Sequence, residues 1–316
     1  MPLTKLMTEN LTRSIHDKAM ELGFSDCGFS KAEPVDHTHK NFVEKWISKK
    51  KHGTMQWLER NKDKRYDPRL LSENAKTIIT VSYNYFSTKK FYDNNSYIIS
   101  KYAYGKDYHY VIKDKLGLLL SFIEEKTGKR KARIFVDSAP VLERYWAQKG
   151  GLGFTGKNTC LINRKNGSFF FIGSLILDLE LNYTKADTAN YCGTCTRCID
   201  ACPTQALKPF EIDANKCLSY ITIEYRDETI PGYFKDKTAN RIFGCDICQD
   251  VCPWNRFAKP HNEPLFEPED ELLKMTKQDW EKLDKPGFKR LFKHSAVKRA
   301  GYHRLMRNIK FNSGSK

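Results

Sequence analysis

The spacing of apolar residues predicts that the first part of the chain mixes helices with strands. Amphipathic helices are expected at residues 8–22 and 107–126, where apolar side chains recur every three or four positions. Shorter helices are expected at 41–50, 55–60 and 141–149. Strands are expected where β-branched, aromatic and apolar residues run together, at 27–29, 77–86, 97–104, 132–136 and 169–179. This alternation indicates a mixed α/β, or α+β, domain.

The pattern changes after a polar stretch at residues 183–191, and we expect three regions. Residues 1–184 would form the α/β domain and residues 185–262 a small cysteine-rich domain. Residues 263–316 would form a basic C-terminal segment of short helices. The helices expected after the polar stretch cover 215–225, 279–292 and 296–310.

Charge adds a candidate interaction surface. The net charge is +16, and residues 285–316 contribute ten Lys or Arg and no Asp or Glu. The aromatic residues interleaved with these cations are Phe288, Phe292, Tyr302 and His303. The segment is therefore a candidate nucleic-acid surface, with a solvated, soluble face as the alternative.

The longest apolar run, 169–177, is far below the roughly 20 residues of a membrane span, and the N-terminus has no signal-like core, so we expect a cytoplasmic protein without membrane contact.

Eight of the ten cysteines lie between residues 192 and 252. The first run, Cys192 to Pro203, has the spacing C-x2-C-x2-C-x3-C-P. Bacterial ferredoxins use this spacing to hold one [4Fe-4S] cluster with three cysteines, while the fourth ligates a second cluster. The second run, Cys245 to Pro253, retains C-x2-C-x3-C-P but has Ile242 where a further ligand would stand.

A cysteine from elsewhere must complete the second set, and Cys217 is the remaining cysteine in this region. We assign one cluster to Cys192, Cys195, Cys198 and Cys252. We assign the other to Cys202, Cys217, Cys245 and Cys248. Structural zinc is the alternative, although zinc sites need neither the x3-C-P tail nor an interleaved eighth ligand. Cys27 and Cys160 belong to no motif and are expected to be structural.

Asp137 follows a predicted strand and opens the sequence Asp-Ser-Ala-Pro. Asp-x-x-Pro ahead of a helix is typical of an N-cap with proline in the first turn. A carboxyl group beside a buried site can instead have a raised pKa and donate a proton. The sequence by itself favours the cap.

The glycines of residues 151–157 match two phosphate-binding patterns, G-x-G-x-x-G and G-x4-G-K, and we reject both. Each pattern needs a strand before the loop and a helix after it. Here a helix is expected before the loop and an extended segment after it. The loop can still approach a large ligand closely and offer Lys157 as a cation.

Together these segments resemble the epoxyqueuosine reductases, cobalamin-dependent enzymes of the last step in queuosine tRNA modification. The resemblance runs from about residue 8 to residue 310. The motifs that carry it are Ser100 to His109 (SKYAYGKDYH), Val136 to Pro140 (VDSAP), Gly151 to Lys157 (GLGFTGK), Cys217 to Tyr220 (CLSY) and Asn240 to Asp246 (NRIFGCD).

The resemblance implies an oxidoreductase that reduces epoxyqueuosine to queuosine at the wobble position of tRNA. It implies that two [4Fe-4S] clusters feed electrons to base-off cobalamin, and that Asp137 is the proton donor and not an N-cap. The residues expected to contact cobalamin are Arg60, Asp137, Lys157, Ser219 and Asp246.

The implied partners are a tRNA carrying epoxyqueuosine and a low-potential electron donor, and a monomer is expected. Arg226, Lys298 and Arg299 are the candidate tRNA contacts. Longer members of the family carry a further helical-repeat module, whereas this sequence stops soon after the point where that module would begin.

Three other functions remain open on the sequence. A reductive dehalogenase also combines cobalamin with two clusters, but such proteins usually carry an export signal. A plain iron-sulfur electron carrier would not need some 190 residues ahead of the clusters. An RNA-binding module with structural zinc is the third.

Overall fold

The computed structural model describes residues 4–186 and 189–314. Lys316, one of the ten basic residues counted above, lies outside these ranges, as do the outermost residues of the first and third expected regions. The N-terminal half is built on a four-stranded sheet in the order β1-β2-β7-β4, and every neighbouring pair is antiparallel. The strands are β1 (Asp26–Lys31), β2 (Thr77–Asn84), β4 (Ala132–Phe135) and β7 (Phe170–Leu177). The predicted mixture of helices and strands is confirmed.

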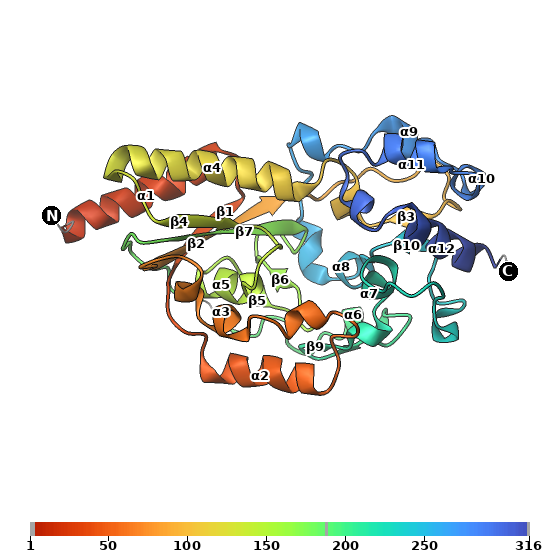
Figure 1. The fold of residues 1–316 in the computed structure, drawn as a ribbon, viewed down its shortest axis with the longest axis horizontal. Helices are drawn as coiled ribbons and strands as arrows, with labels where there is room; N and C mark the ends of the chain where they lie inside the picture. The colour runs from red at the N-terminus through yellow and green to blue at the C-terminus, as the bar shows by residue number, and fades with distance from the viewer. Residues whose placement is uncertain (1–3, 187–188, 315–316) are drawn as a thin grey trace.

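Helices cover both faces of this sheet (Figure 1). On one face lie α1 (Lys5–Glu21) and α4 (Tyr108–Thr127). On the other face lies α5 (Glu143–Lys149), with α2 (His37–Ser48) and α3 (Lys62–Tyr66) on the same side. Because the sheet is covered twice, every residue of β2 except its last is buried. Burial on both faces extends to the polar residues of β2, because Thr77, Thr80 and Ser82 are each at most 2% exposed.

The start of α4 positions part of the candidate site. The side chain of Asp107 caps this helix by accepting a hydrogen bond from the backbone N–H of His109 at 3.1 Å. The helix ends at Gly128, which has a φ of 77°. Tyr108 and His109 are thereby held in the first turn of α4.

Several expected elements are shorter than predicted or divided. Of the strand expected at 97–104, only β3 (Ile98–Ile99) is extended, because its partner β10 (Arg241–Phe243) is itself short. The helix expected at 279–292 is divided into α10 (Lys277–Glu281) and α11 (Lys285–Leu291), because Pro286 lacks the N–H that would continue a helix. Gly301, with a φ of 78°, divides 296–310 into a 3-10 turn and α12 (Tyr302–Ser313).

The cysteine-rich region has little regular structure. Its helices are α6 (Arg197–Asp200), α7 (Leu218–Ile223) and α8 (Ile247–Asp250), and α6 contacts α8. β8 (Leu207–Lys208) and β9 (Glu211–Ile212) form a short hairpin. The glycine loop at 151–157 lies after α5 and carries the first strand of the hairpin β5 (Phe154–Thr155) and β6 (Leu161–Ile162), so the phosphate-binding context is absent as predicted.

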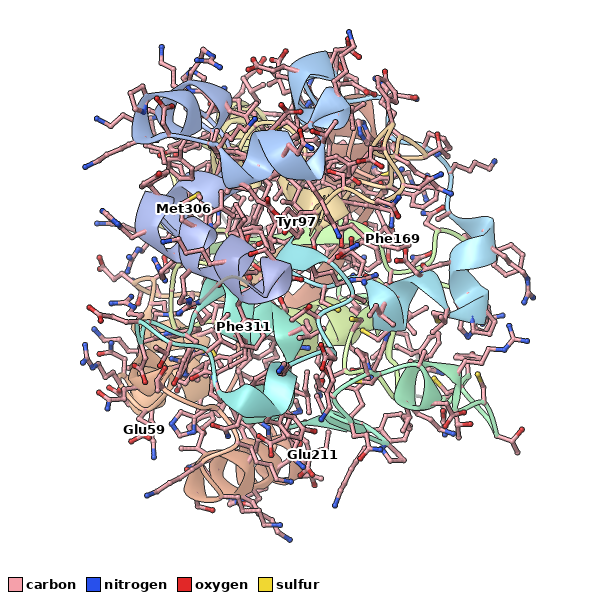
Figure 2. The ribbon with its side chains drawn as sticks, turned by 90° about the vertical axis from the view of Figure 1, so that its right-hand side faces the viewer. Glu59, Tyr97, Phe169, Glu211, Met306 and Phe311 are labelled. Carbon is pink, nitrogen blue, oxygen red and sulfur yellow. The ribbon has the colours of Figure 1, made fainter. Side chains whose placement is uncertain are left out.

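The C-terminal helices share a hydrophobic core with the first region. Trp280 and Phe292 pack with Tyr97, and each is at most 1% exposed. In α12, Met306 packs against this core and Phe311 against the core beneath α7 (Figure 2). The helix α9 (Asp270–Lys274) contributes Leu272 to the same core. The three expected regions therefore interleave in space.

Burial corrects one expectation about the basic segment. Phe288 and Phe292 are only 5% and 1% exposed, so these rings belong to the core and cannot stack on bases. Tyr302 is half-buried and His303 is exposed. In the part of the chain that the structure describes, no helix is both long and apolar enough to cross a membrane.

Candidate active site and cluster-binding region

The eight cysteines between residues 192 and 252 gather in two sets. Cys198 has three cysteines as electrostatic neighbours: Cys192, Cys195 and Cys252. Cys248 has Cys245 and Cys217 as neighbours, and Cys217 in turn has Cys202. The folded chain therefore brings together the two sets that we assigned from spacing, while metal ligation by them stays a prediction.

The spread of these side chains bears on the zinc alternative. Within residues 4–186 and 189–314, no three His, Cys, Asp or Glu side chains come close enough together to hold one metal ion. A tetrahedral zinc site would need four ligands, with each sulfur about 2.3 Å from a single ion. Cluster ligation by these cysteines therefore rests on their spacing in the sequence and not on this geometry.

Lys157 supports the loop of the first cysteine set. Its backbone N–H donates to Cys192 Sγ at 3.4 Å. Its Nζ donates to the carbonyl oxygens of Gly193 and Cys195 at 2.7 and 3.0 Å. These contacts hold the turn between two cysteines, so the ammonium group already has partners within the protein.

The other expected cobalamin contacts differ in how accessible they are. Asp246 is buried, and its Oδ2 accepts a hydrogen bond from the N–H of Lys101 at 2.9 Å. Burial raises the pKa of Asp246. Ser219 lies in the first turn of α7, and Arg60 is exposed after a 3-10 turn. Among the described residues, the Ser219 hydroxyl and the Arg60 guanidinium have no hydrogen-bond partner, so both are free to meet a ligand.

The two cysteines outside the motifs have different surroundings. Cys27 is 5% exposed in β1, and burial raises the pKa of its thiol far above the ordinary range. Cys160 is hydrogen-bonded to Cys248. Asn158 contacts Cys160 and Cys248: its Oδ1 accepts a hydrogen bond from the N–H of Cys160, and its Nδ2 donates one to the carbonyl oxygen of Cys248. The sequence carries no signal for the placement of Cys160, since it lies outside both runs.

Asp137 lies in the loop after β4 and is not a helix cap. The helix α5 begins six residues later, at Glu143, with Leu142 in the cap position. The backbone of Asp137 has a φ of 47°, in the left-handed region. Tyr108 Oη donates to Asp137 Oδ2 at 2.6 Å, while the Asp137 side chain remains 62% exposed. The N-cap interpretation is wrong, and the carboxylate is presented to solvent at the start of α4.

Glu143 is a second carboxyl group at this site, and our sequence analysis did not identify it. Both of its oxygens accept a hydrogen bond from the backbone N–H of Asp137, at 3.0 and 3.1 Å. Burial, and after it the charge of Asp137, raises the pKa of Glu143 to about 8. Glu143 therefore carries a proton well above the pH at which an exposed glutamate loses it.

His109 joins this site to the C-terminal segment. Its Nδ1 lies 2.6 Å from Asp107 Oδ1, and its Nε2 lies 3.9 Å from Asp137 Oδ2. Arg299 Nη1 lies 2.9 Å from the same Nε2. With Arg299 donating to Nε2, the ring proton is assigned to Nδ1 and is donated to Asp107. Burial raises the pKa of Asp107, but the hydrogen bonds from His109 outweigh it and leave that pKa lowered.

The basic residues of the C-terminal segment fall into two kinds. Arg304 and Arg307 donate to the carbonyl oxygens that end α7: Arg304 to Ile223, and Arg307 to Ile221 and Tyr225. These arginines are structural. The other candidates for tRNA contact, Lys298, Arg299 and Arg226, are exposed.

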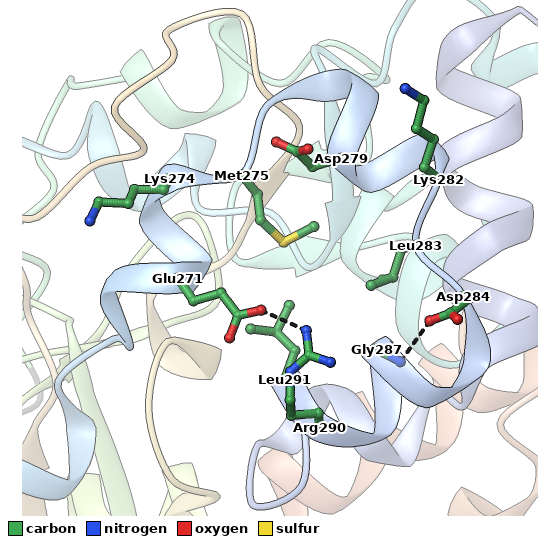
Figure 3. A pocket seen from close by; sticks show the side chains of 10 residues that line it. All are labelled: Glu271, Lys274, Met275, Asp279, Lys282, Leu283, Asp284, Gly287, Arg290 and Leu291. Atoms are coloured by element: carbon green, nitrogen blue, oxygen red, sulfur yellow. Dashed lines mark hydrogen bonds and ion pairs between the residues drawn. The ribbon is translucent and has the colours of Figure 1, made fainter.

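Two surface cavities lie away from this site. The larger, of 630 Å³, is formed by α9, α10 and α11 (Figure 3). Two contacts cross or border it: Arg290 Nη2 is 2.8 Å from Glu271 Oε1, and Asp284 Oδ1 accepts from the N–H of Gly287. The other, of 480 Å³, lies between α1, β1 and residues 182–184. Neither is lined by any of the expected site residues.

Two family models match the chain. Residues 65–138 match the model described as epoxyqueuosine reductase QueG, DUF1730. Residues 191–255 match the 4Fe-4S double cluster binding domain, and this range contains all eight cysteines that we assigned to clusters. The prediction of an iron-sulfur domain is thereby confirmed at the level of the domain.

Whole proteins are also similar to this chain. An epoxyqueuosine reductase from Cellulophaga algicola is 52% identical over 298 residues, which cover 94% of this chain and 96% of that protein. A solved epoxyqueuosine reductase with an epoxyqueuosine-modified stem loop of tyrosine tRNA has a TM-score of 0.86 at 28% identity, covering 96% of this chain and 80% of that one. The Bacillus subtilis enzyme, with the same score, identity and coverage, has been solved with its catalytic aspartate loop swung out of the active site.

The fold is shared more widely. A catabolic reductive dehalogenase matches with a TM-score of 0.53 at 14% identity, covering 95% of this chain and 38% of that one. At this identity the likeness concerns the fold alone.

Proposed function

Because this chain belongs to the epoxyqueuosine reductase family and is an oxidoreductase, we propose that it reduces epoxyqueuosine to queuosine at the wobble position of tRNA. The sequence similarity, which extends along almost the whole chain, carries this proposal. In the reaction the epoxide oxygen leaves as water and an alkene forms, so each turnover consumes two electrons and two protons. The site must therefore supply electrons from one side and protons from another.

The two cysteine sets would supply the electrons. Cys192, Cys195, Cys198 and Cys252 would hold one [4Fe-4S] cluster, and Cys202, Cys217, Cys245 and Cys248 the other. A cluster stores one electron at a time at a potential that hydrogen bonds to its sulfurs help to set. The contact of Lys157 with Cys192 Sγ and the N–H groups of Ser219 and Tyr220 on Cys217 would tune the two clusters in this way.

The residues present fit cobalamin in part. When bound, cobalamin supplies a low-potential cobalt centre that delivers electrons to carbon. Arg60 and Ser219 have unused polar groups, and Asp137 presents an exposed carboxylate, so these three would contact the cofactor. Lys157 and Asp246 would act less directly, because the protein's own groups already engage them.

Asp137 would donate the proton to the epoxide oxygen. Opening an epoxide leaves an alkoxide, and a protonated carboxylic acid within hydrogen-bond reach lowers the barrier, typically by about 10²- to 10⁴-fold. Tyr108 holds the carboxyl group through its 2.6 Å hydrogen bond. A cofactor and substrate lying over this exposed group would exclude water from it.

The tRNA would approach over Arg299. This arginine contacts His109, which lies beside Asp137, so a phosphate bound there would bring the anticodon loop next to the proton donor. Lys298 and Arg226 would add phosphate contacts whose strength falls with salt. The wobble base would be turned out of the loop to reach the site. We expect a monomer fed by a low-potential donor.

The functional regions would follow the expected ranges: residues 1–184 for cobalamin, 185–262 for the clusters and 263–316 for basic helices beside the tRNA. The interleaved cores mean that these regions would fold together and not as independent units.

An anaerobic assay tests this function. Purified protein is incubated with tRNA containing epoxyqueuosine and a low-potential reductant, with and without added cobalamin, and nucleosides are quantified after digestion. We expect queuosine only when cobalamin is present, and visible bands of cobalamin above the broad cluster absorption. Clusters without cobalamin binding and without queuosine would identify a plain electron carrier, and dehalogenation without queuosine would identify a dehalogenase.

A further inference from the structure

The two cysteine sets differ in their distance from solvent. Between the cysteines of the first set lie exposed residues: Gly193, Thr194, Thr196 and Arg197. Of the four residues next to Cys217 and Cys245 in the second set, Leu218, Gly244 and Asp246 are buried and only Lys216 is exposed. The first set therefore lies at the surface and the second toward the interior.

One residue links the second set to the proposed proton donor. Asp246, the neighbour of Cys245 in the chain, and Asp137 both act electrostatically on the half-buried Tyr102. Electrons arriving from outside would thus meet the first set before the second. The surface around the first set is the place where a donor would bind.

Cations gather at that surface. Arg197 lies between Cys195 and Cys198 in α6. Arg256 follows Cys252, and its guanidinium lies 4.4 Å from the centre of the Phe257 ring. Phe257 is 39% exposed. A cation and an apolar ring therefore stand together beside the first set.

A hairpin loop brings one more cation to the same place. The Arg164 guanidinium lies 4.5 Å from the centre of the ring of Tyr191, the residue before Cys192. The base of this loop is fixed by a 2.6 Å hydrogen bond from the N–H of Ser168 to Asn255 Oδ1. We name Arg164, Arg197, Arg256 and Phe257 the cluster-one face. Asp200, an acid on this face, accepts a hydrogen bond from Thr196.

We propose that the cluster-one face docks a small acidic protein that carries one electron at a time. Positive charge there attracts an acidic partner and raises the association rate, and a weak, transient electron-transfer contact needs only a small interface. Phe257 would provide the apolar centre of that interface. This inference rests on the proposed function, because it requires that the first cysteine set hold a reducible cluster.

Repeated encounters between the carrier protein and the cluster-one face would supply the electrons. In each one the carrier is oxidised by one electron and one [4Fe-4S] cluster is reduced by one electron, and no atom is transferred. Two encounters supply the two electrons that one epoxide reduction consumes. The carrier is the reductant, and its chemical class is that of an acidic [2Fe-2S] ferredoxin.

Stopped-flow reduction of the clusters by a reduced acidic [2Fe-2S] ferredoxin tests the proposal. The test protein is the reconstituted full chain with Arg197→Glu and Arg256→Glu, and Arg256→Glu alone serves as a variant that leaves the cysteine run untouched. Lys90→Glu with Lys113→Glu is the matched control: the charge change is the same, both lysines are exposed, and Lys113 lies on α4, across the sheet from α6 (Figure 1).

At low ionic strength we expect the double variant to be reduced at least about 10-fold more slowly than wild type, with the control near wild type. High salt should remove the difference, because it screens the charges of the face. Equal rates for the double variant and the control would overturn the docking face. Weakened tRNA binding with unchanged ferredoxin rates would also overturn it and assign the face to RNA.

Reduction by dithionite distinguishes a failure of the docking face from a failure of the proposed function. Dithionite is small and does not need a protein interface, so it should reduce the clusters of every variant at the same rate. Clusters that dithionite cannot reduce even in wild type would overturn the proposed function, and the docking face with it.

Discussion

The backbone N–H of Asp137 donates to both carboxylate oxygens of Glu143, at 3.0 and 3.1 Å. Asp137 has a φ of 47°, a conformation uncommon for residues other than glycine. The two-oxygen contact stabilises this backbone, while Tyr108 holds the side chain. Glu143 thus serves as a positioning residue for the proposed proton donor. A related enzyme has been solved with its catalytic aspartate loop swung out, which is the motion that such a contact would restrain.

Removing the Glu143 carboxylate should release the Asp137 loop. We expect Glu143→Ala to slow single-turnover reduction of epoxyqueuosine by about 10- to 100-fold, because an interaction worth roughly 1–3 kcal/mol is lost. Glu143→Gln retains an acceptor oxygen and should recover most of the rate. Glu125→Ala, at an exposed position of α4, is the control. Wild-type rates in Glu143→Ala, with the loop unchanged in hydrogen exchange, would show that Glu143 does not position Asp137.

Glu143 should also make stability depend on pH. Its pKa is raised from 4.5 to about 8 in the folded chain, by burial first and by Asp137 second. Between these values the folded chain keeps a proton that the unfolded chain has lost, so the stabilisation is complete below about pH 4.5 and is lost as the pH rises through about 8. In thermal unfolding from pH 5 to pH 8.5, the Tm of wild type should fall relative to that of Glu143→Gln. Parallel Tm curves would contradict the raised pKa.

Replacing the proton donor should separate binding from chemistry. We expect Asp137→Asn to retain its clusters and cobalamin, judged from visible spectra and iron content, while queuosine formation falls below detection. The amide has the shape of the acid but no acidic proton to give, and proton donation is typically worth about 10²- to 10⁴-fold in rate. Retained turnover would exclude Asp137 as the donor.

Cys160 should tune the second cluster. If Cys248 is a thiolate ligand, the Cys160 S–H is the donor in the hydrogen bond between them, and it stabilises the more negative reduced cluster. Cys160→Ala should therefore lower the reduction potential of that cluster. A hydrogen bond of about 1 kcal/mol corresponds to roughly 40 mV for a one-electron couple. Cys160→Ser keeps a donor and should stay near wild type in redox titrations followed by electron paramagnetic resonance. Equal potentials in Cys160→Ala and wild type would show that Cys160 is only structural.

Replacing Arg307 should lower stability, whereas replacing Lys298 should weaken tRNA binding. Arg307→Ala leaves carbonyl oxygens of residues 221, 225 and 227 without their donor, so we expect a loss of about 2–4 kcal/mol in unfolding free energy. Lys298 is exposed, so Lys298→Ala should change stability by less than about 0.5 kcal/mol. It should instead weaken tRNA binding and reduce the slope of log affinity against log salt by roughly 1. Unchanged salt dependence in Lys298→Ala would remove this lysine from the tRNA surface.

The sequence by itself determined features that depend on residues close together in the chain. Apolar periodicity located the helix α4 and the strands β2 and β7, because burial on one or both faces dictates which positions are apolar. Cysteine spacing identified the iron-sulfur domain, because a C-x2-C turn places two sulfurs on one cluster. Short elements such as β3 were extended too far, since their length is set by the partner strand and not by propensity.

Only the tertiary structure decided which distant groups meet. Arg299 reaches His109 across 190 residues, Cys160 lies beside Cys248, and Phe292 enters the core with Tyr97. No spacing rule foresees these contacts, because they arise from how separate segments pack and not from the geometry of a single turn or strand. For the same reason the sequence offered a candidate proton donor, and the fold alone showed that Glu143 holds its backbone.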